Sequence, residues 1–198
     1  MIEIEAKFKV ADLRVVQRRL EELKACPCGK AQVEKDFVYD TPGRAFSRAG
    51  NLVRLRRLGK DCLVTFKGAV MPGRFKKRTE VNLSCTDAKQ ADAFLCSLGL
   101  AGHFSKEKKR RQWRYKQCLV CLDRLPCLGS FVEIEGKPAA IVAAARSLGL
   151  DPQSALKDSY ESLFSLFCLQ RSVRAPAAFK KAEFSFRFEK LLRKKGLL

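Results

Sequence analysis

The sequence lacks several features that would point to other classes of protein. No run approaches the roughly 18 consecutive apolar residues of a membrane-spanning helix, and no charged and apolar leader opens the chain. Histidine occurs once, at His103, which leaves the Cys118 and Cys121 pair without the second half of a zinc site. On a strand these two cysteines would also point to opposite faces. These absences favour a cytoplasmic protein with no membrane span and no zinc centre.

Acidic residues are scarce relative to basic ones. The 198 residues include 40 lysines and arginines against 21 aspartates and glutamates, a formal net charge of +19. Such an excess indicates a polyanionic partner: a phosphate-rich small molecule, a nucleic acid or an anionic surface. The length and the hydrophobic content of 46% suit one domain with a real core. The number of cysteines, nine, is odd, and a chain with a core of this size does not need disulfide bonds for stability. We therefore expect reduced thiols.

Several predicted strands carry charged side chains on one face and apolar side chains on the other. In the opening stretch, residues 1–10, Glu3, Glu5 and Lys7 share a face, because alternate side chains of a strand point the same way. The same alternation recurs in four further stretches: 53–57, 75–82, 120–123 and 131–136. If such strands close into one sheet, the apolar faces must lie outward under helices and the charged faces must line the interior.

Turn and capping signals divide the chain into about eight strands and several helices. We expect helices that begin after the capping residues Asp12 and Thr86 and at Pro138, and a further helix over 159–169 that buries Tyr160. The predicted strands cover 1–10, 33–39, 51–58, 62–66, 75–83, 104–115, 119–123 and 130–136. The predicted fold class is therefore α+β, with an eight-stranded antiparallel closed β-barrel, or tunnel, and flanking helices.

The charged faces supply two kinds of chemistry. Carboxylates on separate strands could meet at a hard divalent cation, Mg²⁺ or Mn²⁺, since such ions take oxygen ligands and share them with substrate phosphates. The predicted metal ligands are Glu3, Glu5, Glu80, Asp123, Glu133 and Glu135. Arginine and lysine bind phosphate oxygens. The predicted phosphate-binding residues are Lys7, Arg54, Arg56, Lys67, Arg78, Lys109 and Arg111.

These motifs resemble the CYTH superfamily, also called triphosphate tunnel metalloenzymes. Glu3, Glu5 and Lys7 are similar to its N-terminal ExExK signature, and the similarity continues in order to about residue 168. The matching stretches are 53–56, 65–68, 78–80, 109–111, 122–123, 129–135 and 159–163. The resemblance implies an eight-stranded tunnel, a divalent metal and chemistry on a triphosphate of a nucleotide, of thiamine or of inorganic phosphate. It implies catalytic roles for Glu3, Glu5, Lys7, Arg56, Glu133 and Glu135.

Three functions remain open on the sequence. Within the superfamily the chain most resembles bacterial members assigned as class IV adenylate cyclases. Cyclases of that class carry a His-Phe pair ahead of ExExK, whereas only Met1 and Ile2 precede Glu3 here, which favours hydrolysis of a triphosphate. Production of cyclic AMP from ATP is the first alternative. A basic barrel that binds polyphosphate or RNA without chemistry is the second, although such a protein gains nothing from acidic residues in its site.

The C-terminal stretch differs in composition from the rest. Residues 171–198 carry nine basic residues against two acidic ones, and Phe184, Phe188, Leu191 and Leu192 fall on one helical face. We therefore expect a tunnel domain over residues 1–169 and a basic, partly helical tail over 170–198. The tail could contact nucleic acid or an anionic surface. The sequence does not predict the oligomeric state.

Overall fold

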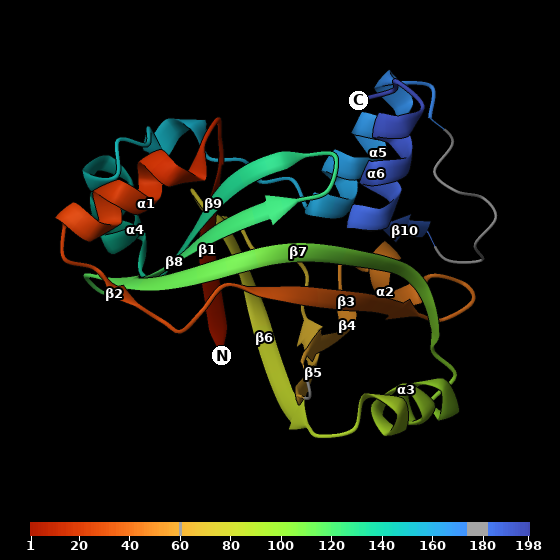
Figure 1. Ribbon diagram of the computed structural model, residues 1–198. Helices are drawn as coiled ribbons and strands as arrows, with labels where there is room; N and C mark the ends of the chain where they lie inside the picture. Colours follow the sequence, from red (N-terminus) through yellow and green to blue (C-terminus); the bar gives the residue numbers. More distant parts are fainter. Residues whose placement is uncertain (60, 174–181) are drawn as a thin grey trace.

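The computed structural model describes residues 1–59, 61–173 and 182–198, and helices are interspersed among the strands along them (Figure 1). In chain order the elements are β1 (Ile2–Val10), α1 (Leu13–Glu22), β2 (Cys26–Pro27), β3 (Gln32–Asp40), α2 (Ala45–Arg48), β4 (Leu52–Leu58), β5 (Asp61–Lys67), β6 (Lys76–Cys85), α3 (Ala88–Ser97), β7 (Ala101–Tyr115), β8 (Cys118–Leu125), β9 (Gly129–Glu135), α4 (Pro138–Ser147), a 3-10 turn (Pro152–Ser154), α5 (Tyr160–Gln170), β10 (Ala182–Phe184) and α6 (Phe186–Lys194).

Eight antiparallel strands close into a barrel. The strand order is β7-β3-β4-β5-β6-β1-β9-β8, and β8 pairs back with β7, so the sheet returns to its first strand. Every pairing around this ring is antiparallel. Two short strands add to β7 from outside the ring: β2 antiparallel and β10 parallel. The predicted α+β class and eight-stranded closed barrel with flanking helices are confirmed.

Apolar side chains cover the outside of the barrel, as the alternation predicts. Ala6 and Phe8 of β1, together with Val132 and Ile134 of β9, are buried in one cluster with residues of α1 and α4. A second cluster lies between α3 and the outer faces of β4 and β5. In Figure 1, α1 and α4 lie together on one side of the barrel and α3 lies on another. The charged alternates of these strands are thereby turned inward.

Helix boundaries follow the predicted capping signals with one correction. The Asp12 side chain accepts a hydrogen bond from the Arg14 amide, and the Ser159 hydroxyl accepts one from the Ser162 amide. At α3, Asp87 and not Thr86 is the cap, because its carboxylate accepts from the Lys89 and Gln90 amides. A carboxylate next to the first turn also interacts favourably with the helix dipole, which explains the shift by one residue.

The C-terminal residues that the structure describes pack on the barrel. The β10 backbone pairs with β7 over Phe104, Ser105 and Lys106. In α6, Glu189 is buried and accepts a hydrogen bond of 2.7 Å from Arg124 of β8, while Leu192 is 3% exposed. Part of the predicted basic tail, residues 174–181, lies outside the described residues. None of the described helices has both the length and the apolar composition needed to span a bilayer.

One pair of cysteines departs from the expectation of reduced thiols. Cys62 of β5 and Cys85 of β6 are directly opposite each other in the antiparallel register, with 5.1 Å between their Cα atoms, and they form a disulfide. Spacing along the chain does not reveal this pairing, because the two residues are 23 positions apart. The other seven cysteines are free thiols.

The outer apolar clusters, rather than the charged interior, should dominate the stability of the barrel. Phe8 is 1% exposed and Val15 on the outer side of α1 is 56% exposed. We expect Phe8→Ala to lower the free energy of unfolding by about 3–5 kcal/mol, because it leaves a cavity under α1 and α4. Val15→Ala, the matched control, should change it by less than about 0.5 kcal/mol. Urea titration followed by circular dichroism measures both, and equal effects would contradict this account.

Candidate active site

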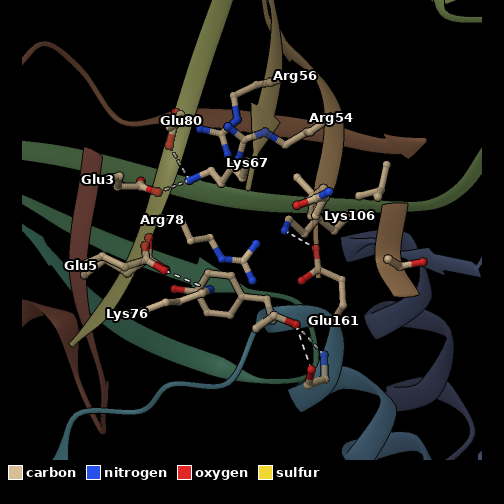
Figure 2. A pocket seen from close by; sticks show the side chains of 18 of the residues that line it. Glu3, Glu5, Arg54, Arg56, Lys67, Lys76, Arg78, Glu80, Lys106 and Glu161 are labelled. Atoms are coloured by element: carbon tan, nitrogen blue, oxygen red, sulfur yellow. Dashed lines mark hydrogen bonds and ion pairs between the residues drawn. The ribbon is translucent and has the colours of Figure 1, made fainter. Parts of the chain in front are cut away.

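The barrel encloses a cavity of about 500 Å³ whose walls are mainly charged side chains (Figure 2). Ten basic and seven acidic residues are among those that line it. The basic ones are Lys7, Arg44, Arg54, Arg56, Lys67, Lys76, Arg78, Lys106, Lys108 and Arg110, and the acidic ones are Glu3, Glu5, Asp40, Glu80, Glu133, Glu135 and Glu161. An interior with more positive than negative groups suits an anionic ligand.

Three carboxylates meet on one wall of this cavity. Glu3 and Glu5 project from β1, and Glu135 projects from β9, where it lies opposite Glu5 in the register. One oxygen of each lies within 4.8 Å of the other two. Hard divalent cations such as Mg²⁺ and Mn²⁺ prefer carboxylate oxygens, so the donor set fits such an ion.

The protonation of these carboxylates reflects burial and their neighbours. Burial raises the pKa of Glu3 to about 7, against the opposing effect of Lys67. Burial likewise raises the pKa of Glu135, with Glu5 among the like charges that add to it. Burial also disfavours ionisation of Glu5, but Lys76 and other ammonium groups outweigh it, so the pKa of Glu5 is lowered. Like charges held this close favour the binding of a cation between them.

The other three predicted metal ligands lie outside this cluster, and each is ion-paired, as Glu3 and Glu5 also are. Glu80 lies 2.8 Å from the Lys67 ammonium. Asp123 is fully buried behind the cavity wall and accepts two hydrogen bonds from Arg110, of 2.7 and 2.6 Å. Glu133 also accepts from Arg110. The structure therefore brings together three of the six predicted carboxylates, and the remaining three lie outside that cluster.

The predicted phosphate-binding residues of β1, β4, β5 and β6 all line the cavity. Figure 2 shows Arg54 and Arg56 extending inward from β4 and Arg78 from β6. Arg56 is tied to Asp36 by two hydrogen bonds of 2.7 and 2.9 Å. Among the described residues, no carboxylate lies within the 4.0 Å ion-pair distance of Arg78, and the Nε atoms of Arg54 and Arg78 are buried without a hydrogen-bond partner. These two guanidinium groups have donors to offer a ligand.

On β7 the face that carries Lys109 and Arg111 was predicted to point into the barrel, and this prediction is wrong. Lys106, Lys108 and Arg110 line the cavity, whereas Lys109 is exposed on the outside. The Arg111 guanidinium lies 4.9 Å from the centre of the Trp113 ring, and Trp113 is buried in the outer apolar cluster. Both faces of this strand are basic, so charge could not set the phase. Trp113, which lies on the same face as Lys109 and Arg111, is the apolar residue that indicates which face of β7 points outward.

Two acidic residues of β3 were missed. Glu34 and Asp36 alternate on the strand predicted at 33–39, a repeat of the pattern in β1. Asp36 is 1% exposed, and although burial opposes ionisation, Arg56 and Arg54 hold the pKa of its carboxyl well below its usual range. Lys108 and other cations likewise lower the pKa of Glu34 against burial. Both carboxylates neutralise cations at this end of the barrel.

The start of α5 also contributes to the cavity. Sequence periodicity assigned Tyr160 to a helix core, and it gave Glu161 no role. In the structure both line the cavity, and the Glu161 carboxylate accepts a hydrogen bond of 2.5 Å from Lys106. Lys76 of β6, within the charged stretch 75–82, also lines the cavity and lies 3.1 Å from Glu5. These contacts join residues that are distant in the chain, so spacing alone could not reveal them.

Comparison with known proteins agrees with the fold. A family model described as the CYTH domain matches residues 1–160. A protein of Methanocaldococcus jannaschii, provisionally named an adenylate cyclase, is 25% identical over 135 residues, which cover 68% of this chain and 77% of the relative.

Solved structures share the same architecture. A Vibrio parahaemolyticus protein, also provisionally called an adenylate cyclase, superposes with a TM-score of 0.74 at 21% identity and covers 83% of this chain and 98% of its own. A Hippeastrum protein described as an adenylyl cyclase with a dominant triphosphatase activity superposes with a TM-score of 0.61 at 14% identity, covering 85% and 95%. At these identities the likeness concerns the fold.

The ion pairs of β3 should make the fold sensitive to acid. Because the folded-state pKa of Asp36 is depressed, its stabilising effect is present above the unfolded-state pKa of about 3.9 and is lost as the pH falls towards the folded-state value. We expect the free energy of unfolding in urea to fall below about pH 5. Asp36→Asn should already cost about 3–5 kcal/mol at neutral pH, since it removes the carboxylate that Arg54 and Arg56 share and leaves Arg56 with Glu34 alone.

Asp61→Asn is the control for this experiment, because Asp61 is exposed at the start of β5. It should keep both the stability and the pH dependence of the unmodified protein. A protein with Asp36→Asn that matches Asp61→Asn in both respects would show that the buried pairs of β3 do not carry the acid sensitivity.

Proposed function

The chain belongs to the CYTH domain family, and from this premise together with the cavity we propose that it is a divalent-metal-dependent enzyme that hydrolyses a linear triphosphate, with inorganic triphosphate as the leading substrate. The observation that carries the proposal is that one cavity holds three convergent carboxylates together with Arg78, which has no acidic partner among the described residues, and Arg54, whose Nε has no hydrogen-bond partner there. A triphosphate shares its charge between a metal ion and cationic side chains.

Each group of residues then has a separate task. Glu3, Glu5 and Glu135 hold Mg²⁺ or Mn²⁺, which when bound neutralises phosphate charge and activates the attacking water. Lys7, Arg54 and Arg78 hold the phosphate oxygens, and they stabilise negative charge that develops in the transition state. Enclosure by the barrel limits the access of bulk water and strengthens these interactions. We also propose that residues 1–169 form the catalytic domain and that 170–198 are an appended segment.

Three of the predicted site residues, Arg56, Lys67 and Glu133, are paired with other charged groups of the cavity. Arg56 is held by Asp36, and Lys67 is held between Glu3 and Glu80, so each meets the substrate with part of its charge already compensated. Glu133 anchors Lys7 at 3.5 Å rather than joining the carboxylate cluster. Lys109 and Arg111, which face outward, have no role in it.

The names of relatives do not decide between hydrolysis and cyclisation, because both descriptions occur on this fold. We favour hydrolysis because the described lining residues are mostly charged and suit phosphates. Cyclic AMP formation remains the alternative that the experiment must address. A purely RNA-binding role is disfavoured, because Trp113 is 2% exposed and its ring cannot stack on bases.

The first test measures phosphate and cyclic AMP released from inorganic triphosphate and from ATP, each with Mg²⁺ or Mn²⁺. We expect rapid phosphate release from triphosphate, no cyclic AMP, and a loss of about 100-fold in kcat with Glu5→Gln. Glu21→Gln, on the exposed side of α1, is the matched control and should keep full activity. Cyclic AMP with pyrophosphate would establish the cyclase instead, and no release from either substrate would refute both enzymatic readings.

A second test compares a cation inside the barrel with one outside it. Arg78→Gln should lower kcat/KM for triphosphate roughly 10- to 100-fold, because a charge-assisted hydrogen bond contributes about 1.5–3 kcal/mol. Lys109→Gln removes a cation from the exposed face of β7 and should leave kcat/KM unchanged. If both variants lose activity equally, general electrostatic attraction rather than the cavity accounts for substrate binding.

A further inference from the structure

The segment that leads into α5 is folded around a single lysine of β1. The Leu156 amide donates a hydrogen bond of 2.7 Å to the Lys7 carbonyl oxygen. The Lys7 ammonium donates one of 2.8 Å to the Asp158 carbonyl oxygen. The same ammonium lies 4.0 Å from the centre of the Tyr160 ring. Of three alternate residues in one segment, Leu156 therefore contacts the Lys7 backbone, and Asp158 and Tyr160 both contact its ammonium.

The Tyr160 ring is itself fixed on two sides. Its hydroxyl donates a hydrogen bond of 3.2 Å to the buried carboxylate of Asp123. Its ring packs edge-on against Phe131, with 5.2 Å between the ring centres. The side chain is 4% exposed, and it stands at the first position of α5, directly after the Ser159 cap. A ring held in this way offers the cavity a rigid face.

Two further lysines of the cavity surround the same ring. The ammonium groups of Lys106 and Lys108 each lie 5.9 Å from its centre. An aromatic face attracts a cation through its quadrupole but carries no net charge. The three lysines already have carboxylate neighbours: Glu133 lies 3.5 Å from Lys7, Glu161 2.5 Å from Lys106 and Asp123 3.3 Å from Lys108. The ring orients the ammonium groups without adding further negative charge, so part of their positive charge stays available to an anion.

We propose that Tyr160 is a positioning residue of the anion site, whose ring holds the Lys7 ammonium in its binding position beside Lys106 and Lys108. The inference rests on the proposed function in one respect, that the anion is a triphosphate. It adds a residue that acts through its π face and not by touching the reacting atoms. It also gives the segment 156–160 a purpose beyond connecting α4 to α5.

The plain alternative is that Tyr160 only fills the apolar cluster between α5 and β9. Two substitutions separate the two accounts. Tyr160→Phe keeps the ring and its packing on Phe131 but loses the hydroxyl. Tyr160→Leu keeps an apolar side chain but removes the π face. Phe167→Leu, later in α5 and packed against the same cluster, is the control for loss of an aromatic ring.

Binding of inorganic triphosphate is measured by calorimetry on the full chain with a metal chelator present, so that no turnover occurs. We expect Tyr160→Leu to raise Kd about tenfold and Tyr160→Phe to raise it no more than about threefold. Phe167→Leu should leave Kd unchanged. Equal affinity of Tyr160→Leu and the unmodified protein would overturn the inference. A triphosphate that neither binds the unmodified protein in the chelator nor is hydrolysed by it with Mg²⁺ or Mn²⁺ would overturn the proposed function itself.

A spectroscopic measurement tests the contact independently of any ligand. A lysine ammonium placed over a ring shifts the NMR signals of its adjacent methylene protons upfield, and the Lys7 signals are assigned by their absence in Lys7→Gln. Tyr160→Phe should retain the upfield shift and Tyr160→Leu should abolish it, with both proteins folded by circular dichroism. Ordinary lysine shifts in the unmodified protein would show that the ring does not hold Lys7.

Discussion

The pairing of β7 with both β3 and β8 is the constraint on which the rest of the structure depends. It closes the ring, so each strand acquires an inner and an outer face and alternate residues are divided between them. The apolar alternates of β1 and β9 then bury themselves under α1 and α4. The charged alternate residues therefore point into the barrel interior, where solvent is limited. A buried charge there is stable only when it is paired with an opposite charge or a ligand.

The inner and outer faces consequently contribute differently to the free energy of folding. Buried ion pairs such as Arg110 with Asp123 and Arg56 with Asp36 lose about as much in desolvation as they gain in attraction. Net stability must come from the outer apolar clusters. The interior can therefore be arranged for a ligand, and its cost is tolerated because helices α1, α3 and α4 protect the other side of the same strands.

Sequence reasoning succeeded where the two faces of a strand differ in kind. On β1 and β9 the apolar alternates settle which way Glu5 and Glu135 point, so their meeting could be predicted. On β7 both faces are basic, and the phase was read from Lys109 rather than from Trp113. The role of Tyr160 could not be predicted, since its ring reaches Lys7 across the fold from a helix start that looks like ordinary core.

Cations in the interior differ in how far they are compensated, and this difference connects the proposed chemistry to the fold. Arg110 is neutralised by Asp123 and Glu133, which makes it part of the wall. Arg78 lacks such a partner among the described residues, and Lys7 is oriented partly by an uncharged ring. A polyanion that enters the cavity meets cations that are already held in position and only partly compensated, so little ordering is needed on binding. It also compensates the excess positive charge, so occupancy of the cavity must stabilise the barrel that encloses it.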